Sequence, residues 1–500
     1  MAYELDVITK YMFDRFVGRS MVQTNAREIT SGNVIQVVNN AMTTHRRNSA
    51  EIDYLYRYYC GEQDVKDKKK LVRAEVNNKV CENRANEIVT FKTAFLLAQP
   101  IQYIAAGDVS DEISENIRLL NEFMRMEDKE SIDKDTADWL HICGIAPRMA
   151  VRDSDWNGEE DGSPFTIYSL DPREAFVIYH SGLGHRPMAG VIIQTDENDK
   201  EYLCVYTRDF YCEIQGDEFI KYPERHLIGR IPVVEYVANK ARMGAFEAVL
   251  PLLNALNQTQ SDRADSIQDF VNAYDVFQNC DIDGETYKEL AKGGGAIKVK
   301  TTVPGMEAKV YRIMSELSQQ GVETTVEDFR SAITEICGMP NRNGGSSTSD
   351  TGTAVMLRDG FAEAESRAKD TETYWNRSER ELLKVILSLC PGQLKLMISD
   401  IQIEWTRKNL TNLQSKVQSL CELLANEKIH PKDAYAAVSG LFVDTEQAYR
   451  NGMQWYEEQQ KKLEESLLNT QENADENSDE EYENSDKDTE NSEPPKNDEE

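Results

Sequence analysis

The chain has 500 residues, a hydrophobic content of 40% and a formal net charge of −32. This length is sufficient for several domains that each bury a core of their own. The excess of negative charge argues against a nucleic-acid-binding protein that grips its ligand by neutralising phosphates. Residues 471–500, with 14 Asp or Glu and 2 Lys, contribute −12 of the total, so the remainder of the chain is acidic as well.

Neither a membrane segment nor a disulfide framework is expected. No apolar run approaches the about 18 residues that a membrane-spanning helix requires. The start of the chain lacks the basic and apolar regions of a secretory signal. The nine cysteines include no CxxC pair, which is typical of reduced thiols in a cytosol-like compartment.

The first half of the chain begins with helical patterns and then changes to β patterns. Residues 1–32 are weakly patterned and are interpreted as an N-terminal arm, and the basic run at residues 66–70 is interpreted as a solvated loop. The helical spacing of apolar residues predicts helices over 34–59, 77–99, 112–126 and 129–141. Alternating apolar residues between turn signals predict strands over 101–104, 148–152, 165–169, 175–179, 189–195, 201–207, 210–215 and 232–236.

A long helix and a small α/β unit come next. The helix predicted over 247–274 has an apolar first half and a polar second half, so we expect it to pack along one side and to expose the rest. The α/β unit is predicted to contain strands over 275–279, 296–300 and 308–313 and a helix over 284–291. A further helix is predicted over 322–337, where Thr324 and Glu327 fit a capping box.

A polar loop separates this helix from a much longer one. Residues 341–352 contain no large apolar residue, so they cannot offset the entropy of being ordered by burying surface. The helix predicted over 354–389 would span about 54 Å at about 1.5 Å per residue, with Gly360 as a bend point. A mobile loop between two rigid helices indicates a segment that acts on a ligand or partner.

The last part of the chain is predicted to be helical and then disordered. A strand is expected over 401–405, and helices are expected over 412–426, 431–439 and 445–468. Residues 471–500 have almost no apolar content, which predicts disorder.

Motifs for catalysis and metal binding are weak. Asp350-Thr351-Gly352 matches the short aspartic-protease pattern, but that chemistry needs a second carboxylate and an Asp that follows an apolar strand. The glycines at 293–295 lie outside any P-loop pattern, and His180 and His185 lack the spacing of a metal site. The residues therefore predict a protein that is not an enzyme and has no cofactor or metal site. A hydrolase that uses Asp350 is the alternative from another class.

Several stretches together resemble one known family. They are Asn-Asn-Lys at 77–79, Ala-Gln-Pro-Ile-Gln-Tyr at 98–103, Asp-Pro-Arg-Glu-Ala-Phe-Val-Ile-Tyr at 171–179, Ile-Pro-Val-Val-Glu-Tyr at 231–236, and Gly-Thr-Ala-Val-Met at 352–356 after the Gly/Ser loop. Their order and spacing, over about residues 35–400, resemble the SPP1-type portal proteins of tailed bacteriophages.

The resemblance implies an α+β, mostly helical portal-type subunit with long stem helices, a β-rich wing and a small α/β clip, assembling into a ring. On the family template the parts are an N-terminal arm 1–32, the wing 33–245, a stem helix 246–274, the clip 275–320, a second stem helix 321–338, the tunnel loop 339–353, the long helix and wing closure 354–410, a helical crown 411–470 and the acidic disordered tail 471–500.

The resemblance also implies a function and partners. About twelve copies would form a ring at one capsid vertex, and double-stranded DNA would pass through its channel, without sequence specificity, during packaging and ejection. The implied partners are the terminase large subunit, a head-completion or adaptor protein, and the major capsid and scaffolding proteins, with no membrane. The implied location is the virion, preceded by the host cytoplasm during assembly.

The resemblance also points to particular residues. The implied DNA-channel residues are Asn341, Arg342, Asn343, Gly344, Gly345, Ser346, Ser347, Thr348, Ser349 and Asp350. The implied residues for clip formation and motor docking are Tyr287, Lys288 and Leu290. The residues leave open another virion structural homo-oligomer that has no DNA channel.

Overall fold

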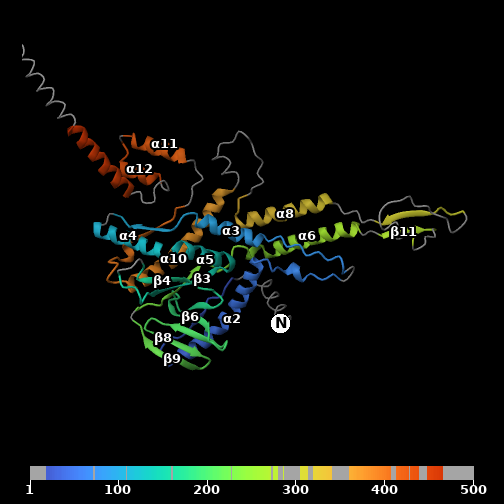
Figure 1. Ribbon diagram of the computed structural model, residues 1–500, viewed down its shortest axis with the longest axis horizontal. Coiled ribbons are helices and arrows are strands. Elements are labelled where there is room, and N and C mark those ends of the chain that lie inside the picture. The colour runs from blue at the N-terminus through green and yellow to red at the C-terminus, as the bar shows by residue number, and fades with distance from the viewer. Residues whose placement is uncertain are drawn as a thin grey trace, which may run out of the picture. The chain divides into compact units, whose positions relative to one another are not determined.

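The structure is a computed structural model, and it describes residues 18–70, 74–107, 110–158, 162–226, 228–271, 274–279, 285, 305–313, 319–340, 360–406, 413–426, 428–438 and 447–465. The chain forms two compact units, Met1–Arg407 and Lys408–Glu500. Helices and several sheets occur together, so the predicted α+β class is confirmed (Figure 1).

The helices of the first unit follow the apolar pattern of the sequence. Helix α2 spans Val34–Tyr59, as predicted. Helix α4 (Asp111–Met126) begins after Ser110, whose hydroxyl accepts a hydrogen bond from the Ile113 amide at 3.4 Å, a common N-cap arrangement. The other long helices are α3 (Arg84–Leu96), α5 (Lys129–Cys143), α6 (Leu250–Val271), α8 (Gln319–Cys337) and α10 (Phe361–Leu389).

A six-stranded sheet lies against α2 (Figure 1). Its strands, in spatial order, are β1 (Gln23–Thr24), β5 (Ala175–His180), β6 (Pro187–Thr195), β7 (Glu201–Tyr206), β8 (Phe210–Gln215) and β9 (Glu218–Arg225). β1 is parallel to β5, and the remaining neighbours are antiparallel. Val34, Val38 and Met42 of α2 join Ile178 and Val191 of the sheet in one buried cluster, which fixes the helix on this face.

The two edge strands of this sheet were not predicted from the sequence. β9 contains Pro223, which cannot donate to the ladder and is tolerated because β9 lies at the edge. β1 has only two residues, too few for a recognisable alternation. Residues 18–24, which the sequence assigns to the N-terminal arm, pack on the body, because the buried guanidinium of Arg19 pairs with buried Glu247 at 2.7 Å.

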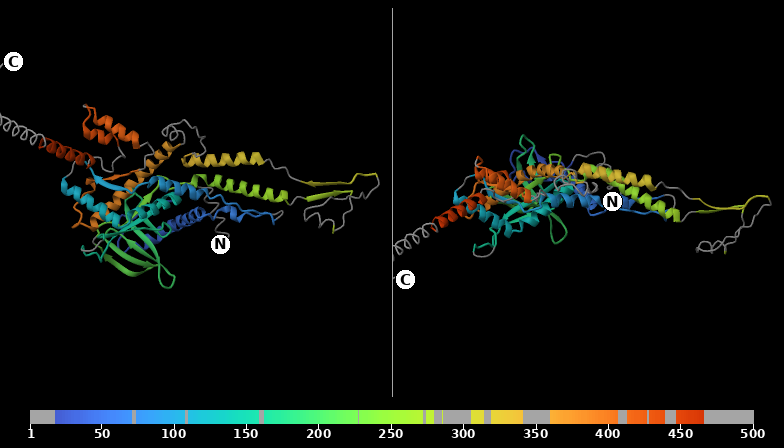
Figure 2. Two further views of the ribbon diagram at one scale, coloured as in Figure 1. Left: turned by 45° about the horizontal axis from the view of Figure 1, so that its top comes forward. Right: turned by 90° about the horizontal axis from the view of Figure 1, so that it is seen from above.

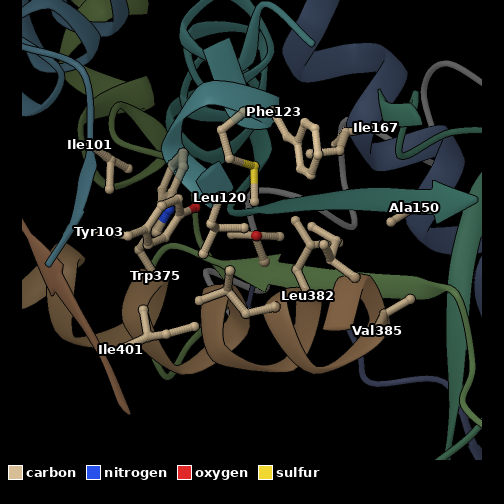
Figure 3. Close-up of a cluster of buried hydrophobic side chains, with 14 of the residues drawn as sticks. Ile101, Tyr103, Leu120, Phe123, Ala150, Ile167, Trp375, Leu382, Val385 and Ile401 are labelled. Atoms are coloured by element: carbon tan, nitrogen blue, oxygen red, sulfur yellow. The ribbon is translucent and has the colours of Figure 1, made fainter. Parts of the chain in front are cut away.

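The largest hydrophobic core lies between α10, α4 and two smaller sheets. One sheet has the order β10 (Val233–Val237), β3 (Ile145–Arg152) and β4 (Phe165–Ser169), and the other pairs β13 (Ile401–Glu404) with β2 (Gln102–Ala105). Figure 3 shows Trp375, Leu382 and Val385 of α10 and Leu120 and Phe123 of α4 directed into this shared core.

A carboxylate is buried at the centre of this core. Glu379 of α10 is 0% exposed and accepts hydrogen bonds from the hydroxyls of Tyr103 on β2 at 2.5 Å and Tyr236 on β10 at 2.7 Å. The indole of Trp375 donates a third hydrogen bond at 3.1 Å, and the ammonium group of Lys129 on α5 lies 3.2 Å away. One side chain therefore connects four elements that are distant in sequence.

A buried guanidinium completes the network. Arg148 of β3 is also 0% exposed, and it lies 2.6 Å from a carboxylate oxygen of Asp133 and 3.6 Å from one of Glu379. Its guanidinium carbon is 4.7 Å from the ring centroid of Tyr236, within the range of a cation–π contact. Burial by itself would raise the pKa of Glu379, but Lys129 and Arg148 outweigh that effect and lower the pKa below its usual range.

Two predictions about the long helices are wrong. Helix α8 begins at Gln319, so Thr324 lies inside the helix, where its hydroxyl donates to the Gln320 carbonyl at 3.0 Å instead of forming a capping box. The helix α8 begins with Gln319, Gln320 and Gly321, none of which is a large apolar residue. The apolar pattern therefore places the start of the helix too late in the sequence. Gly360 is not a bend inside a helix, because it has φ 83 and directly precedes α10.

The second unit is a small helical cluster. Helix α11 (Leu413–Leu424) packs on α12 (Pro431–Ala437) through buried Leu420 and Ala434. Residues 447–465 are helical, and the ring of Tyr449 lies 6.0 Å from that of Tyr435. The acidic tail predicted over 471–500 lies outside the described residues.

Replacing the buried carboxylate should strongly destabilise the first unit. We expect Glu379→Gln to lower the free energy of unfolding by about 3–5 kcal/mol, because Lys129 and Arg148 would be left buried without a full counter-charge. Denaturant unfolding followed by tryptophan fluorescence measures this change, since Trp375 reports directly on the core. The matched control is Glu381→Gln, which removes an exposed carboxylate and should cost at most about 1 kcal/mol. Equal effects of the two variants would show that the network contributes nothing beyond a surface pair.

Candidate functional site

Two helices, α6 and α8, lie side by side and antiparallel (Figure 2). Leu253 and Leu256 of α6 share a buried cluster with Val326 and Ile333 of α8. These are the elements for which the resemblance implies stem helices. Because the apolar contacts come from the first half of α6, its second half must be held by other interactions.

An extended segment that precedes α3, residues 76–83, covers one side of α6. Three buried polar side chains of α6, spaced four residues apart, accept hydrogen bonds from three backbone amides of this segment. The pairs are Asn257 with the Glu82 amide at 2.8 Å, Ser261 with the Val80 amide at 3.0 Å, and Asp265 with the Asn78 amide at 2.6 Å.

The regular spacing of this ladder follows from backbone geometry. Four residues of an α-helix rise about 6 Å, and two residues of an extended chain rise about 6.6 Å, so the two periods agree over the two steps between these three pairs. The helix α6 therefore packs along one side, as predicted, although the buried side chains on that side of its polar half are themselves polar. The ladder corrects one prediction: residues 77–83 are not helical, because their amides bind α6, so α3 begins only at Arg84.

The carboxylate of Glu82 joins both long helices to this segment. It accepts hydrogen bonds from Nε and Nη2 of Arg330 on α8, at 2.9 and 3.0 Å, and from the side-chain amide of Gln260 on α6 at 3.1 Å. A bidentate arginine–carboxylate pair is among the stronger polar contacts in proteins. Burial alone would raise the pKa of Glu82, but the hydrogen bonds from Arg330, Gln260 and Arg84 prevail and lower it to about 2.

The basic run at residues 66–70 is partly ordered by α6. Lys68 lies 3.0 Å from a carboxylate oxygen of Asp265 and 2.7 Å from one of Asp262, and Lys70 lies 3.4 Å from Asp265. The interpretation of this run as a solvated loop is therefore wrong for Lys68 and Lys70. Burial raises the pKa of Asp265, but the Asn78 amide and the Lys68 ammonium group lower it to about 2.

A strand pair lies between α6 and α8 in the sequence. β11 (Tyr274–Gln278) follows α6, and β12 (Lys309–Ile313) precedes α8 and pairs with β11 in antiparallel register. Both strands agree with the predicted strands to within one residue at each end. Tyr287, Lys288 and Leu290, the predicted docking residues, lie outside the described residues, as do the helix predicted over 284–291 and the strand predicted over 296–300.

The end of α8 and the beginning of α10 meet at one point. A Cβ atom on Gly360 would lie 3.7 Å from the Cα atom of Pro340, so the two backbones are in contact. Arg367 of α10 donates from Nη1 to the Ile336 carbonyl at 2.6 Å, where a cation favours the C-terminus of α8. Its Nη2 also pairs with Glu363 at 2.5 Å. The segment between the two helices is therefore anchored with both ends together.

The predicted DNA-channel residues, Asn341 to Asp350, lie between these anchors and outside the described residues. Asp350, the residue of the hydrolase alternative, lies there as well. Within the described ranges, no group of three or more His, Cys, Asp or Glu side chains is placed to hold a metal ion. Among the helices that the structure describes, none is long and apolar enough to cross a membrane.

The sequence matches one protein family over most of its length. Residues 41–475 match the family described as "Phage portal protein, SPP1 Gp6-like". The chain therefore belongs to this family of phage portal proteins, which is a structural family, and the resemblance stated from the sequence is confirmed. No curated protein matches the sequence.

Solved structures with a similar chain come from gene transfer agent particles. A chain from the virion of a native gene transfer agent particle has a TM-score of 0.43 and 11% identity, covering 79% of this chain and 94% of its own. A chain from the neck of the native particle, computed with C12 symmetry, has a TM-score of 0.41 and 11% identity, and the match covers 71% of this chain and 89% of that one. A chain from the neck of the empty particle, computed with C6 symmetry, has a TM-score of 0.42 and 11% identity, and the match covers 72% of this chain and 90% of that one.

The Glu82 contact predicts a dependence of local stability on pH. The folded-state pKa of about 2 lies below the ordinary value of 4.5, so the contact contributes its full stability above about pH 4.5 and loses it as the pH falls through 2. We expect Glu82→Gln to lower the opening free energy of α8 by about 1.5–3 kcal/mol at neutral pH, since charged hydrogen bonds are lost. The difference from the wild type should nearly vanish near pH 2.

Hydrogen–deuterium exchange of the α8 amides, comparing variant with wild type at each pH, measures this effect. Glu87→Gln is the matched control, because Glu87 is 36% exposed and pairs with Arg84 of α3. A pH-independent loss in Glu82→Gln, or an equal loss in the control, would contradict the role given to the Glu82 carboxylate.

Proposed function

We propose that this chain is the portal subunit of a tailed phage or phage-like particle. About twelve copies form a closed ring at one capsid vertex, and double-stranded DNA passes through its channel during packaging and ejection. The proposal is carried by the match to the portal family over residues 41–475. The ring is part of the virion, and its subunits are assembled in the host cytoplasm.

The antiparallel pair α6 and α8 supports the assignment of these helices to the stem. The strand pair β11–β12, which the sequence places between them, belongs to the clip, and residues 275–320 form the outer end of the channel. There the terminase large subunit docks first and the head-completion or adaptor protein docks later, with Tyr287, Lys288 and Leu290 contributing. The wing and crown meet the major capsid and scaffolding proteins.

The loop at residues 339–353 lines the channel and touches the DNA. Its single cation is Arg342, and its other polar groups are uncharged hydroxyls, amides and backbone N–H groups apart from Asp350. Few counterions would be displaced at each contact, so DNA binding should depend only weakly on salt. Together with a chain of net charge −32, this favours sliding over gripping. The role is structural and uses no catalytic residue.

The loop assignment predicts a packaging defect in a variant that still assembles. We expect Gly344→Pro/Gly345→Pro to retain the ring but to lower the amount of nuclease-protected DNA in filled heads several-fold. Proline fixes φ and removes the N–H group at each position, which restricts the backbone where glycine is most permissive. Gly344→Ser/Gly345→Ser is the matched control, because it adds side chains and keeps both N–H groups.

Light scattering of each variant measures assembly independently of packaging. The wild type and both variants should show a mass many times the 57.0 kDa of one chain. A monomer at every protein and salt concentration would contradict the ring itself. Normal packaging by the proline variant would show that the loop has no part in DNA passage. The ring itself would not be contradicted, and a virion oligomer without a working channel loop would be favoured.

A further inference from the structure

A large cavity opens in the first unit beside β10 and α10. Its volume is about 950 Å³, and it is lined by apolar side chains that include Val177 of β5, Val237 of β10 and Val385 of α10. Folded interiors leave few voids larger than a water molecule, so this is no packing defect. Its size lies at the upper end of the about 300–1,000 Å³ that is usual for a pocket that receives a ligand or another segment.

The cavity lining carries more positive than negative charge. Arg208, Arg230, Lys240 and Arg377 line the cavity and are exposed, whereas its two carboxylates are already paired, Glu235 with Arg242 and Glu381 with Lys384. Within the described part of the chain, no carboxylate lies within salt-bridge distance of these four side chains. The occupant should therefore combine an apolar face with acidic groups, because apolar walls exclude water while unpaired cations attract carboxylates.

The described chain starts at this cavity. The amide of Arg19 donates to the Arg242 carbonyl at 3.0 Å, and Met21 is itself part of the cavity wall. Gly18 lies so close to Ala241 that an added Cβ atom would collide with its carbonyl oxygen. Residues 1–17 therefore enter the fold beside Lys240 and Arg242, both of which line the cavity.

Residues 1–17 are weakly patterned overall, but they can present an apolar face to this cavity. In a helix, Leu5, Ile8, Met12 and Phe16 would fall on one face. Glu4, Asp6 and Asp14 supply three carboxylates against the two cations Lys10 and Arg15, so the side chains of the segment carry a small excess of negative charge.

We propose that residues 1–17 fold back into this cavity of their own chain. The apolar face of Leu5, Ile8, Met12 and Phe16 packs on the valines of the cavity lining, and the carboxylates of the segment approach the exposed cations of that lining. This inference concerns the folding of one subunit and stands apart from the proposed portal function.

Photo-crosslinking in the assembled full chain tests which chain supplies the occupant. A benzophenone amino acid in place of Ile8 should crosslink to residues 228–240 or 374–385 of the same chain. The same probe in place of Val7, on the opposite face of the predicted helix, should give far less of this product. Crosslinks to another chain, crosslinks elsewhere, or equal yields from the two positions would overturn the proposal.

Hydroxyl-radical footprinting supplies a second readout that does not depend on the crosslinker. We expect Ile8→Ser to raise the oxidation rates of Tyr374 and Met21, both in the cavity wall, several-fold. Val7→Ser, the matched change on the other face, should leave both rates unchanged. If Ile8→Ser leaves both rates unchanged while the variant stays folded by circular dichroism, the segment does not occupy the cavity and the proposal is wrong.

Discussion

The arrangement of the two long helices depends on buried polar groups of α6 that must be satisfied. Asn257 and Ser261 are 0% exposed and Asp265 is 3% exposed. Leaving such a group without a partner costs about 1–3 kcal/mol, so α6 could not be buried on this side without an ordered donor. The extended segment at 76–83 provides that donor at each step, and Glu82 at its end adds the contact with Arg330 of α8. These polar contacts therefore hold the second half of α6 on the body, whereas the apolar contacts come from its first half.

A second buried network places α10 in the core and connects it to the proposed loop. Glu379 ties the helix to β2, β10 and α5, and Arg367, twelve residues or about 18 Å earlier on the same helix, binds the end of α8. Because one continuous helix carries both contacts, a displacement at the loop anchors would be resisted by the core.

Sequence reasoning was most accurate where one apolar pattern determines an element. The helix over 34–59 and the strands over 165–169 and 210–215 were predicted with the bounds found in the structure, since each buries a single regular face. It failed where polar contacts between distant segments decide the structure. The ladder between residues 76–83 and α6 has no local signal, so residues 77–83 were predicted as helix. The edge strand β9 was also not predicted, because it contains Pro223 and proline argues against a strand.

The proposed functional residues follow from the order and spacing of the family's motifs along the chain, not from local chemistry. Their composition does not set them apart from other surface segments: this holds for the loop at 341–350 and for residues 287, 288 and 290. Their proposed roles come from the resemblance to portal proteins. What the structure adds is the support around the loop. The contact of Gly360 with Pro340 and the bond from Arg367 could not be read from the sequence, because they depend on how α8 and α10 meet.

Electron microscopy of the purified, assembled chain tests the central claim most directly. We expect ring-shaped particles with an axial opening wide enough for a DNA duplex, bordered by the helix pair α6 and α8. Particles without a central opening, or with this helix pair on the outer rim, would contradict the proposal that the chain forms a DNA channel.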